Sequence, residues 1–443
     1  MKLPLLRKTL LVALLGGTFS PVAAEGLGDV YRLAAETDPG LAAADAARRA
    51  ALEAEPQARA LLLPSVALSG SYTRNSYDPR NPAPGQKTSY STNQSYGLSL
   101  SQPIYRHDRF VALAQAGEQV AQAEAEYAAA EQELMVRVAE RYFAVLGAQD
   151  DLEFAQAEKA AIARQHEQAQ QRFEVGLIAV TDVQEAQARY DLAVAQEIAA
   201  RDRLDSARDA LREVLGTLPA ALDVLAPPLD LVPPEPDSAD AWVQRALADN
   251  LGLRAARAAV AIARQEIRRQ RAGHLPTVDL TASYTYQDLN FGGIAAIERN
   301  DGSIGLSLNV PLYQGGLVSS RTRAAGHRLV EAQQQLEARN RTVARQARDA
   351  YRGVVTGIAR VRALAQALKS SETALEAAET GFEVGTRTIV DVLNAQRERY
   401  RAERDLQRAR YDYMLNSLRL KQAAGALAPT DMEALDRWLR PAG

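Results

Sequence analysis

Two short segments that lie far apart in the chain carry glycine, hydroxyl and charged residues at matching positions. They read FEVGLIAVTD at residues 173–182 and FEVGTRTIVD at residues 382–391. Gly176 and Gly385 permit the positive φ angle that commonly follows the last turn of a helix. Because helical patterns flank both phrases, we interpret each phrase as the turn of a helical hairpin.

The hydroxyl and acidic residues of these turns have the chemistry of helix capping. In a capping box, two side chains three residues apart form hydrogen bonds to the backbone at the start of a helix. This spacing occurs twice, in Thr181 with Gln184 and in Thr388 with Asp391. Capping of this kind does not account for Arg387, nor for an Asp at the same place in both turns. These charged residues are therefore candidates for a functional role.

Catalytic and metal-binding chemistry has no support in the sequence. The chain contains no cysteine, which excludes disulfides, thiolate metal sites and an N-terminal lipid anchor. No phosphate loop, nucleophile elbow or zinc motif occurs, and the histidines are scattered, at His107, His166, His274 and His327. The net charge of −3 does not favour nucleic-acid binding. We expect no enzyme activity, no cofactor and no metal site.

The first 24 residues have the pattern of a cleaved secretory signal peptide. Basic residues precede the apolar run TLLVALLGG, and small residues follow it. An uncleaved anchor is the alternative, but the run is shorter than the ~20 residues that a membrane span needs. We expect the mature chain to start at Glu25, and no later segment is apolar enough to span a membrane as a helix.

A repeat with a period near 210 residues runs through the whole chain. The segment LPSVALSGSYT at 63–73 returns as LPTVDLTASYT at 275–285, and SYGLSLSQPIY at 95–105 returns as SIGLSLNVPLY at 303–313. A fixed period means one structural unit duplicated in tandem. We expect a first repeat at 25–217, a proline-rich linker at 218–240, a second repeat at 241–425 and a C-terminal tail at 426–443.

Each repeat shows the same order of elements. A helical stretch comes first, about 28–60 and 240–273, and two alternating strands follow, near 65–77 with 94–106, and near 277–289 with 303–313. A long helical hairpin completes each half, from about 108 to 215 and from 317 to 424. At 1.5 Å per residue, its first helix is roughly 95 Å long. Prolines mark the four junctions between sheet and helix, at Pro64, Pro103, Pro276 and Pro311.

In the predicted strands, apolar residues alternate with small and polar residues, so that each kind lies on its own face of the sheet. Such alternation fits a membrane β-barrel with an apolar outer face and a wet lumen, and it also fits a soluble sheet with one buried face. Long polar loops at 78–93 and 290–301 and the secretory leader favour the barrel. Four strands cannot close a barrel, and an open edge is not tolerated in lipid, so two, three or four copies must share it.

The segments 175–191 (VGLIAVTDVQEAQARYD), 384–396 (VGTRTIVDVLNAQ) and 310–316 (VPLYQGG), with the paired hairpins, resemble the TolC family of outer-membrane channel proteins. The resemblance covers essentially the whole mature chain. It implies a mainly α fold with β structure: a homotrimer with a shared 12-stranded barrel in the outer membrane and a helical barrel crossing the periplasm. Residues 218–240 and the C-terminal tail would contribute to an equatorial belt around the helices.

The resemblance also implies partners and cargo. The family exports drugs or proteins together with a periplasmic adaptor and an inner-membrane transporter, which is an ABC or a proton-driven pump. The main alternative is a periplasmic coiled-coil adaptor or structural protein. Adaptors have one helical hairpin and a lipoyl-like sheet, whereas this chain has two hairpins. Which cargo and which transporter belong to this chain stays open.

The family's gate residues carry over onto the two turns. In the family, an Arg of the second turn links to a Thr-Asp pair of the first and holds the periplasmic mouth shut, which implies Arg387 with Thr181 and Asp182. A further link uses a tyrosine hydroxyl, but this chain has Phe382 there, so that hydrogen bond cannot form and the closed state is expected to be weaker.

Two positions correspond to the acidic rings that line the family's entrance. Asp391 matches the first ring, but Asn394 stands in place of the second, so one charged ring is expected to be missing. The alternative for Asp391 is that it only completes the cap begun by Thr388.

Overall fold

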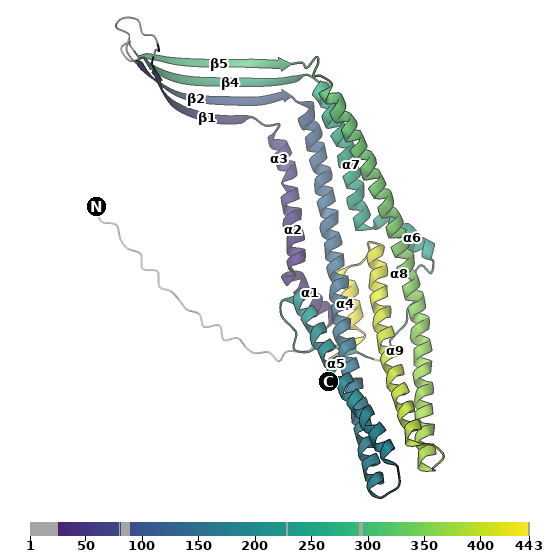
Figure 1. Ribbon diagram of the computed structural model, residues 1–443. Coiled ribbons are helices and arrows are strands. Elements are labelled where there is room, and N and C mark those ends of the chain that lie inside the picture. The colour runs from purple at the N-terminus through teal and green to yellow at the C-terminus, as the bar shows by residue number, and fades with distance from the viewer. Residues whose placement is uncertain (1–24, 79, 81–88, 227–228, 292–295, 442–443) are drawn as a thin grey trace, which may run out of the picture.

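The computed structural model describes residues 25–441 except 79, 81–88, 227–228 and 292–295. A sheet lies at one end of the molecule, and long helices run from it to two tips at the other end (Figure 1). The predicted signal peptide lies outside the described residues. Among the described helices, none is both long and apolar enough to cross a bilayer.

Both halves of the chain fold into the same order of elements. The first half forms α1 (Leu27–Thr37), α2 (Pro39–Leu52), α3 (Ala54–Ala60), β1 (Ser65–Tyr77), β2 (Ser89–Tyr105), α4 (His107–Glu174) and α5 (Val180–Leu215). After β3 (Val224–Leu225), the second half forms α6 (Ala239–Asp249), α7 (Leu251–Arg271), a 3-10 turn (Ala272–His274), β4 (Thr277–Phe291), β5 (Ile297–Asn309), α8 (Leu317–Glu383) and α9 (Ile389–Ala423). The chain ends with α10 (Pro429–Asp436) and β6 (Leu439–Arg440). The predicted repeat of helix, β-hairpin and helical hairpin is confirmed.

The four long strands form one antiparallel sheet in the order β1-β2-β4-β5. Cross-strand partners share a face, and the register pairs Leu68 with Leu98 and Ala282 with Ile304. This apolar face is exposed in the single chain, with Leu68 81% and Ile304 78% accessible. The opposite face carries hydroxyls, among them Ser71, whose Oγ lies 2.8 Å from that of its cross-strand partner Ser95.

Two strands are longer than the sequence predicted. β2 begins at Ser89 rather than near 94, and β5 begins at Ile297 rather than near 303. The ladder continues there, because Ser89 pairs with Tyr77 and Ile297 with Leu289. The polar composition of these stretches resembles that of loops, but polar side chains are compatible with a strand whose backbone is fully paired. The two predicted loops are therefore shorter than expected.

The prolines predicted to mark the junctions between sheet and helix lie at or near the ends of the strands. Pro64 and Pro276 immediately precede β1 and β4, and Pro311 lies two residues beyond β5. Pro103 lies inside β2, two residues before its end at Tyr105, next to an irregularity in the pairing of β2 with β4 between Pro103 and Tyr105. Proline has no N–H to donate to the ladder, and a local irregularity in pairing accommodates that loss.

The main hydrophobic core lies around the middle of the long helices, where α1, α4, α5, α9 and α10 meet. Tyr142 of α4 is fully buried there, and its hydroxyl donates to the carbonyl oxygen of Asp223 at 2.7 Å. The linker and the C-terminal tail also meet at this level, because β3 pairs with β6. Their contribution to an equatorial belt stays a prediction.

Candidate functional site at the tips of the helical hairpins

Each tip is a tight turn between two long helices. α4 ends at Glu174 and α5 begins at Val180, while α8 ends at Glu383 and α9 begins at Ile389. The glycines after the helices have positive φ angles, 76° at Gly176 and 79° at Gly385. An equivalent backbone hydrogen bond of 2.8 Å closes each turn. Leu177 N–H donates to the carbonyl oxygen of Arg172, and Thr386 N–H donates to that of Gly381. The predicted turns and the role of both glycines are confirmed.

The second turn contains the predicted capping box. Thr388 is the N-cap of α9, and its Oγ1 accepts from the backbone N–H of Asp391 at 3.3 Å. The Asp391 carboxylate in turn accepts from the backbone N–H of Thr388 at 2.9 Å and from its hydroxyl at 2.8 Å. Hydrogen bonds from the backbone and then from the side chain of Thr388 lower the pKa of Asp391. Asp391 is therefore ionised and fixed at the start of α9.

In the first turn, the predicted pair of Thr181 with Gln184 was wrong. α5 begins earlier, and its N-cap is Ala179. Asp182 is the third helical residue, and its carboxylate accepts from the backbone N–H of Ala179 at 3.3 Å. Because Asp391 occupies the same position in α9, helix capping does explain why an Asp recurs in both turns. The expectation that capping does not account for this Asp is therefore wrong.

A groove between the two hairpins brings several of the predicted residues together. Its lining includes Asp182, Phe382, Arg387 and Thr388, together with Arg172. Among the residues that the structure describes, no hydrogen bond or ion pair within one chain joins Arg387 to the Thr-Asp pair. The latch is therefore not formed as a direct contact within one chain, although Asp182 and Arg387 face the same groove.

The stem of the Arg387 side chain packs against a glycine of the same helical hairpin. A Cβ atom added at Gly381 would lie 2.6 Å from Cγ of Arg387, so the arginine stem occupies the space that the glycine leaves. The backbone N–H of Arg387 also donates to the carbonyl oxygen of Gly381 at 3.1 Å. A side chain at position 381 would displace Arg387, so this glycine sets where the guanidinium can reach.

Sequence reasoning missed a contact between the two hairpins. The guanidinium carbon of Arg172, at the end of α4, lies 5.5 Å from the centroid of the Phe382 ring at the end of α8. A cation over an aromatic face at this distance is attracted to it. The signal in the sequence was a break in the repeat, because Arg172 stands where the second half has Gly381.

Asn394 lies one turn beyond Asp391 on α9. It is exposed, and it lines a second groove between the hairpins together with Leu192 of α5 and Tyr400 of α9. A ring at either level requires several copies of the chain. The assignment of Asp391 and Asn394 to entrance rings stays a prediction.

Comparisons with known proteins find the same family over most of the chain. The family model for outer membrane efflux proteins matches residues 30–217 and 242–426. Outer membrane protein TolC of Vibrio cholerae is 42% identical over 433 residues, which cover 97% of each chain. The alkaline protease secretion protein AprF of Pseudomonas aeruginosa is 34% identical over 415 residues, 92% of this chain and 86% of AprF.

A solved structure shows the same fold at low sequence identity. The Campylobacter jejuni CmeC outer membrane channel matches with a TM-score of 0.79 at 16% identity, covering 98% of this chain and 97% of that one. The likeness includes both the sheet and the paired helical hairpins of Figure 1. With its family model matched in both halves, the chain belongs to the outer membrane efflux protein family, the channels of the outer membrane through which cells export material.

Proposed function

We propose that three copies of this chain form one channel-tunnel, with a shared 12-stranded barrel in the outer membrane and a helical barrel in the periplasm. The observation that supports this most is the four-stranded sheet: it exposes an apolar face, and within the described chain its edge strands β1 and β5 each pair on one side only. Unpaired backbone groups at such an edge find no partner in lipid. Three sheets joined edge to edge satisfy all of them.

The mass of the detergent-extracted complex tests this assembly. Native mass spectrometry, or light scattering corrected for bound detergent, is expected to give three times the mass of the mature chain. A monomer that keeps its native secondary structure in detergent would contradict the shared barrel.

We further propose that the tips dock onto a periplasmic adaptor, which connects the channel to an inner-membrane ABC or proton-driven transporter. Apolar side chains are exposed at both tips, with Leu177 73% accessible in the first turn and Val384 70% in the second. Exposed apolar groups at the end of a long helical structure are typical of a binding surface. The family assignment leaves the alternative, that the chain is itself the adaptor, without support.

The cargo that we propose is small toxic molecules or secreted proteins. One relative, AprF, is named an alkaline protease secretion protein, and another relative is named outer membrane protein TolC. Deletion of the gene, followed by measurement of drug susceptibility and of the secreted proteins, separates the two kinds of cargo. A deletion strain that is unchanged in both would contradict the proposed export function.

We propose that Arg387 and the pair Thr181 and Asp182 hold the entrance shut. Arg387 and Asp182 both line the groove between the hairpins, which supports this proposal, and threefold symmetry would repeat the arrangement. An exposed ion pair is worth only about 0–1 kcal/mol, so closure depends on several such contacts acting together.

A further inference from the structure

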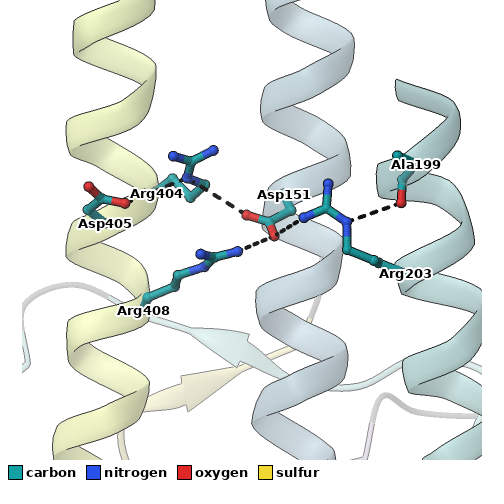
Figure 2. Close-up of polar contacts among 6 residues, drawn as sticks. All are labelled: Asp151, Ala199, Arg203, Arg404, Asp405 and Arg408. Atoms are coloured by element: carbon teal, nitrogen blue, oxygen red, sulfur yellow. Dashed lines mark hydrogen bonds and ion pairs between the residues drawn. The ribbon is translucent and has the colours of Figure 1, made fainter. Parts of the chain in front are cut away.

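A buried carboxylate stands at the centre of the bundle where the two hairpins meet. Asp151 of α4 is only 8% accessible. Figure 2 shows three arginines converging on it from neighbouring helices, Arg203 from α5 and both Arg404 and Arg408 from α9. Arg408 makes the closest contact, Arg203 Nη1 lies 3.4 Å from Oδ2, and Arg404 Nε lies 4.0 Å from Oδ1.

The partners of Asp151 come from both hairpins, and this makes it a link between them. Arg203 belongs to the same hairpin as Asp151, because α4 and α5 are joined by the first turn. Arg404 and Arg408 belong to the second hairpin. A buried ionised carboxylate is costly unless a cation accompanies it. The second hairpin therefore cannot leave α4 at this level without leaving Asp151 with Arg203 alone.

Toward the tips from this cluster, large apolar side chains on the long helices are at most partly buried, among them Phe154 and Tyr400, whose ring centroids lie 6.4 Å apart across the two hairpins. Around its level the buried residues include Leu146, Leu204 and Leu406. Between this level and the tips, the described hydrophobic residues that are buried on the four long helices are all alanines, namely Ala161, Ala193, Ala200 and Ala378. The two grooves between the hairpins lie in the same part of the molecule. The hairpins therefore share little fully buried apolar surface near the tips, and in the described part of the chain Asp151 is the buried charged residue that lies nearest to them.

The two arginines of α9 are spaced so that one can replace the other. Arg404 and Arg408 are four residues apart, which is about one helical turn, or roughly 6 Å along the axis. Arg404 also lies 3.6 Å from Asp405, so it keeps a carboxylate partner when Asp151 bonds to Arg408. A tilt of α9 about this level can lengthen one of these two contacts while the other arginine stays beside the buried carboxylate.

We propose that Asp151 and the pair Arg404 and Arg408 form the pivot about which the second hairpin moves against the first when the periplasmic tips separate. The inference rests on the proposed gate at the tips, and it adds the point at which the gating motion is anchored. Arg404 and Arg408 act as successive partners of one carboxylate, and Arg203 holds that carboxylate in place within the first hairpin.

The test compares variants that cut the link between hairpins with one that does not. Asp151→Asn and the double variant Arg404→Gln/Arg408→Gln remove the link, whereas Arg203→Gln removes one guanidinium from the same carboxylate within one hairpin. Because the chain has no cysteine, nitroxide labels can be placed at Gln168→Cys on α4 and Val390→Cys on α9, which line the groove near the tips. Pulsed electron resonance on the detergent-solubilised complex then measures the separation of the tips.

We expect longer or broader label distances in Asp151→Asn and in the double variant, and wild-type distances in Arg203→Gln. Each single variant, Arg404→Gln or Arg408→Gln, should change less than half as much as the double one, because the remaining arginine takes over. In planar bilayers, the open probability should rise about tenfold in the double variant, equivalent to about 1.4 kcal/mol. If Asp151→Asn fails to assemble, the double variant and Arg203→Gln decide the question.

Wild-type distances in an assembled double variant would overturn the pivot, and so would equal changes in the double variant and Arg203→Gln. The proposed gate fails separately. Label distances that change while conductance stays at the wild-type value would support the pivot and contradict a gate at the tips. Unchanged distances combined with a conductance that responds to replacement of Arg387 would contradict the pivot alone.

Discussion

The guanidinium of Arg172 lies 5.5 Å above the ring of Phe382 and joins the ends of the two helical hairpins within one chain. The family resemblance implies a tyrosine, with a hydroxyl that forms a hydrogen bond, at the position of Phe382. A cation–π contact at an exposed site contributes about 0.5–1 kcal/mol. This chain therefore has an attraction between its tips that does not require a hydroxyl group.

Replacing Phe382 tests this contact. Phe382→Leu removes the aromatic face while keeping an apolar side chain, and we expect a modest rise in single-channel conductance in planar bilayers. Phe382→Tyr keeps the face and adds a hydroxyl, so its conductance should be equal to or below that of the wild type. Arg164→Ala, which removes another exposed arginine of α4, is the matched control. A Phe382→Leu channel indistinguishable from this control would exclude a role for the contact in closure.

The charge of Asp391 can be separated from its capping bonds. Asp391→Asn removes the charge, and Asn394→Asp adds a second charged level, whereas Thr388→Ala removes a capping partner but keeps the charge. If three copies of Asp391 surround the pore, like charges there favour cations. Reversal potentials in a salt gradient should then show lower cation selectivity in Asp391→Asn, higher selectivity in Asn394→Asp and little change in Thr388→Ala.

Block of the channel by multivalent cations is a second measurement that tests the same variants. We expect weak block of the wild type, less block of Asp391→Asn and more of Asn394→Asp. Identical reversal potentials in the wild type and both charge variants would mean that Asp391 serves only as a helix cap.

The stability of the helical bundle should depend on pH through Asp150. Burial raises the pKa of this carboxyl from 3.8 to about 6, although the hydroxyl of Tyr411, which donates to it at 2.8 Å, opposes the shift. Because the folded pKa lies above the unfolded one, the folded state binds the proton more tightly. Stability should therefore rise as the pH falls from about 6 to about 4, by on the order of 3 kcal/mol.

Asp150→Asn is the variant that tests this dependence. Its amide has nearly the same shape and can still accept from Tyr411, but it carries no charge. We expect its assembled form to dissociate at a higher temperature than the wild type at pH 7.5, and its stability to change less between pH 6 and pH 4. Equal melting temperatures at pH 7.5 would show that the buried charge of Asp150 costs the native state nothing.

The sequence was informative wherever a pattern repeats. The tandem repeat, the two long hairpins and the alternating strands were all predictable, because periodicity reports which face of an element is apolar. The start of β2 at Ser89 was not predictable from the same signal, since polar residues there resemble a loop and only pairing with β1 identifies a strand. The same limit applies to β5.

The candidate site was predictable only in part. Gly176 and Gly385 were identified because few residues other than glycine adopt a positive φ angle. Thr181 was misplaced because the spacing of a cap does not fix where a helix begins. Asp151 was missed altogether, since its partners Arg404 and Arg408 are more than 250 positions away in the sequence and converge on it only in the folded chain.

The most direct test of the central claim, that the hairpin tips form a closed gate held by Arg387, is the single-channel conductance of Arg387→Ser in planar bilayers. The wild-type assembly is expected to conduct weakly because its entrance is narrow. Arg387→Ser and Asp182→Ala should each raise the conductance, because each removes one side of the proposed latch while leaving the sheet and the helical core intact. Conductance equal to that of the wild type in both variants, measured on intact assemblies, would contradict the account.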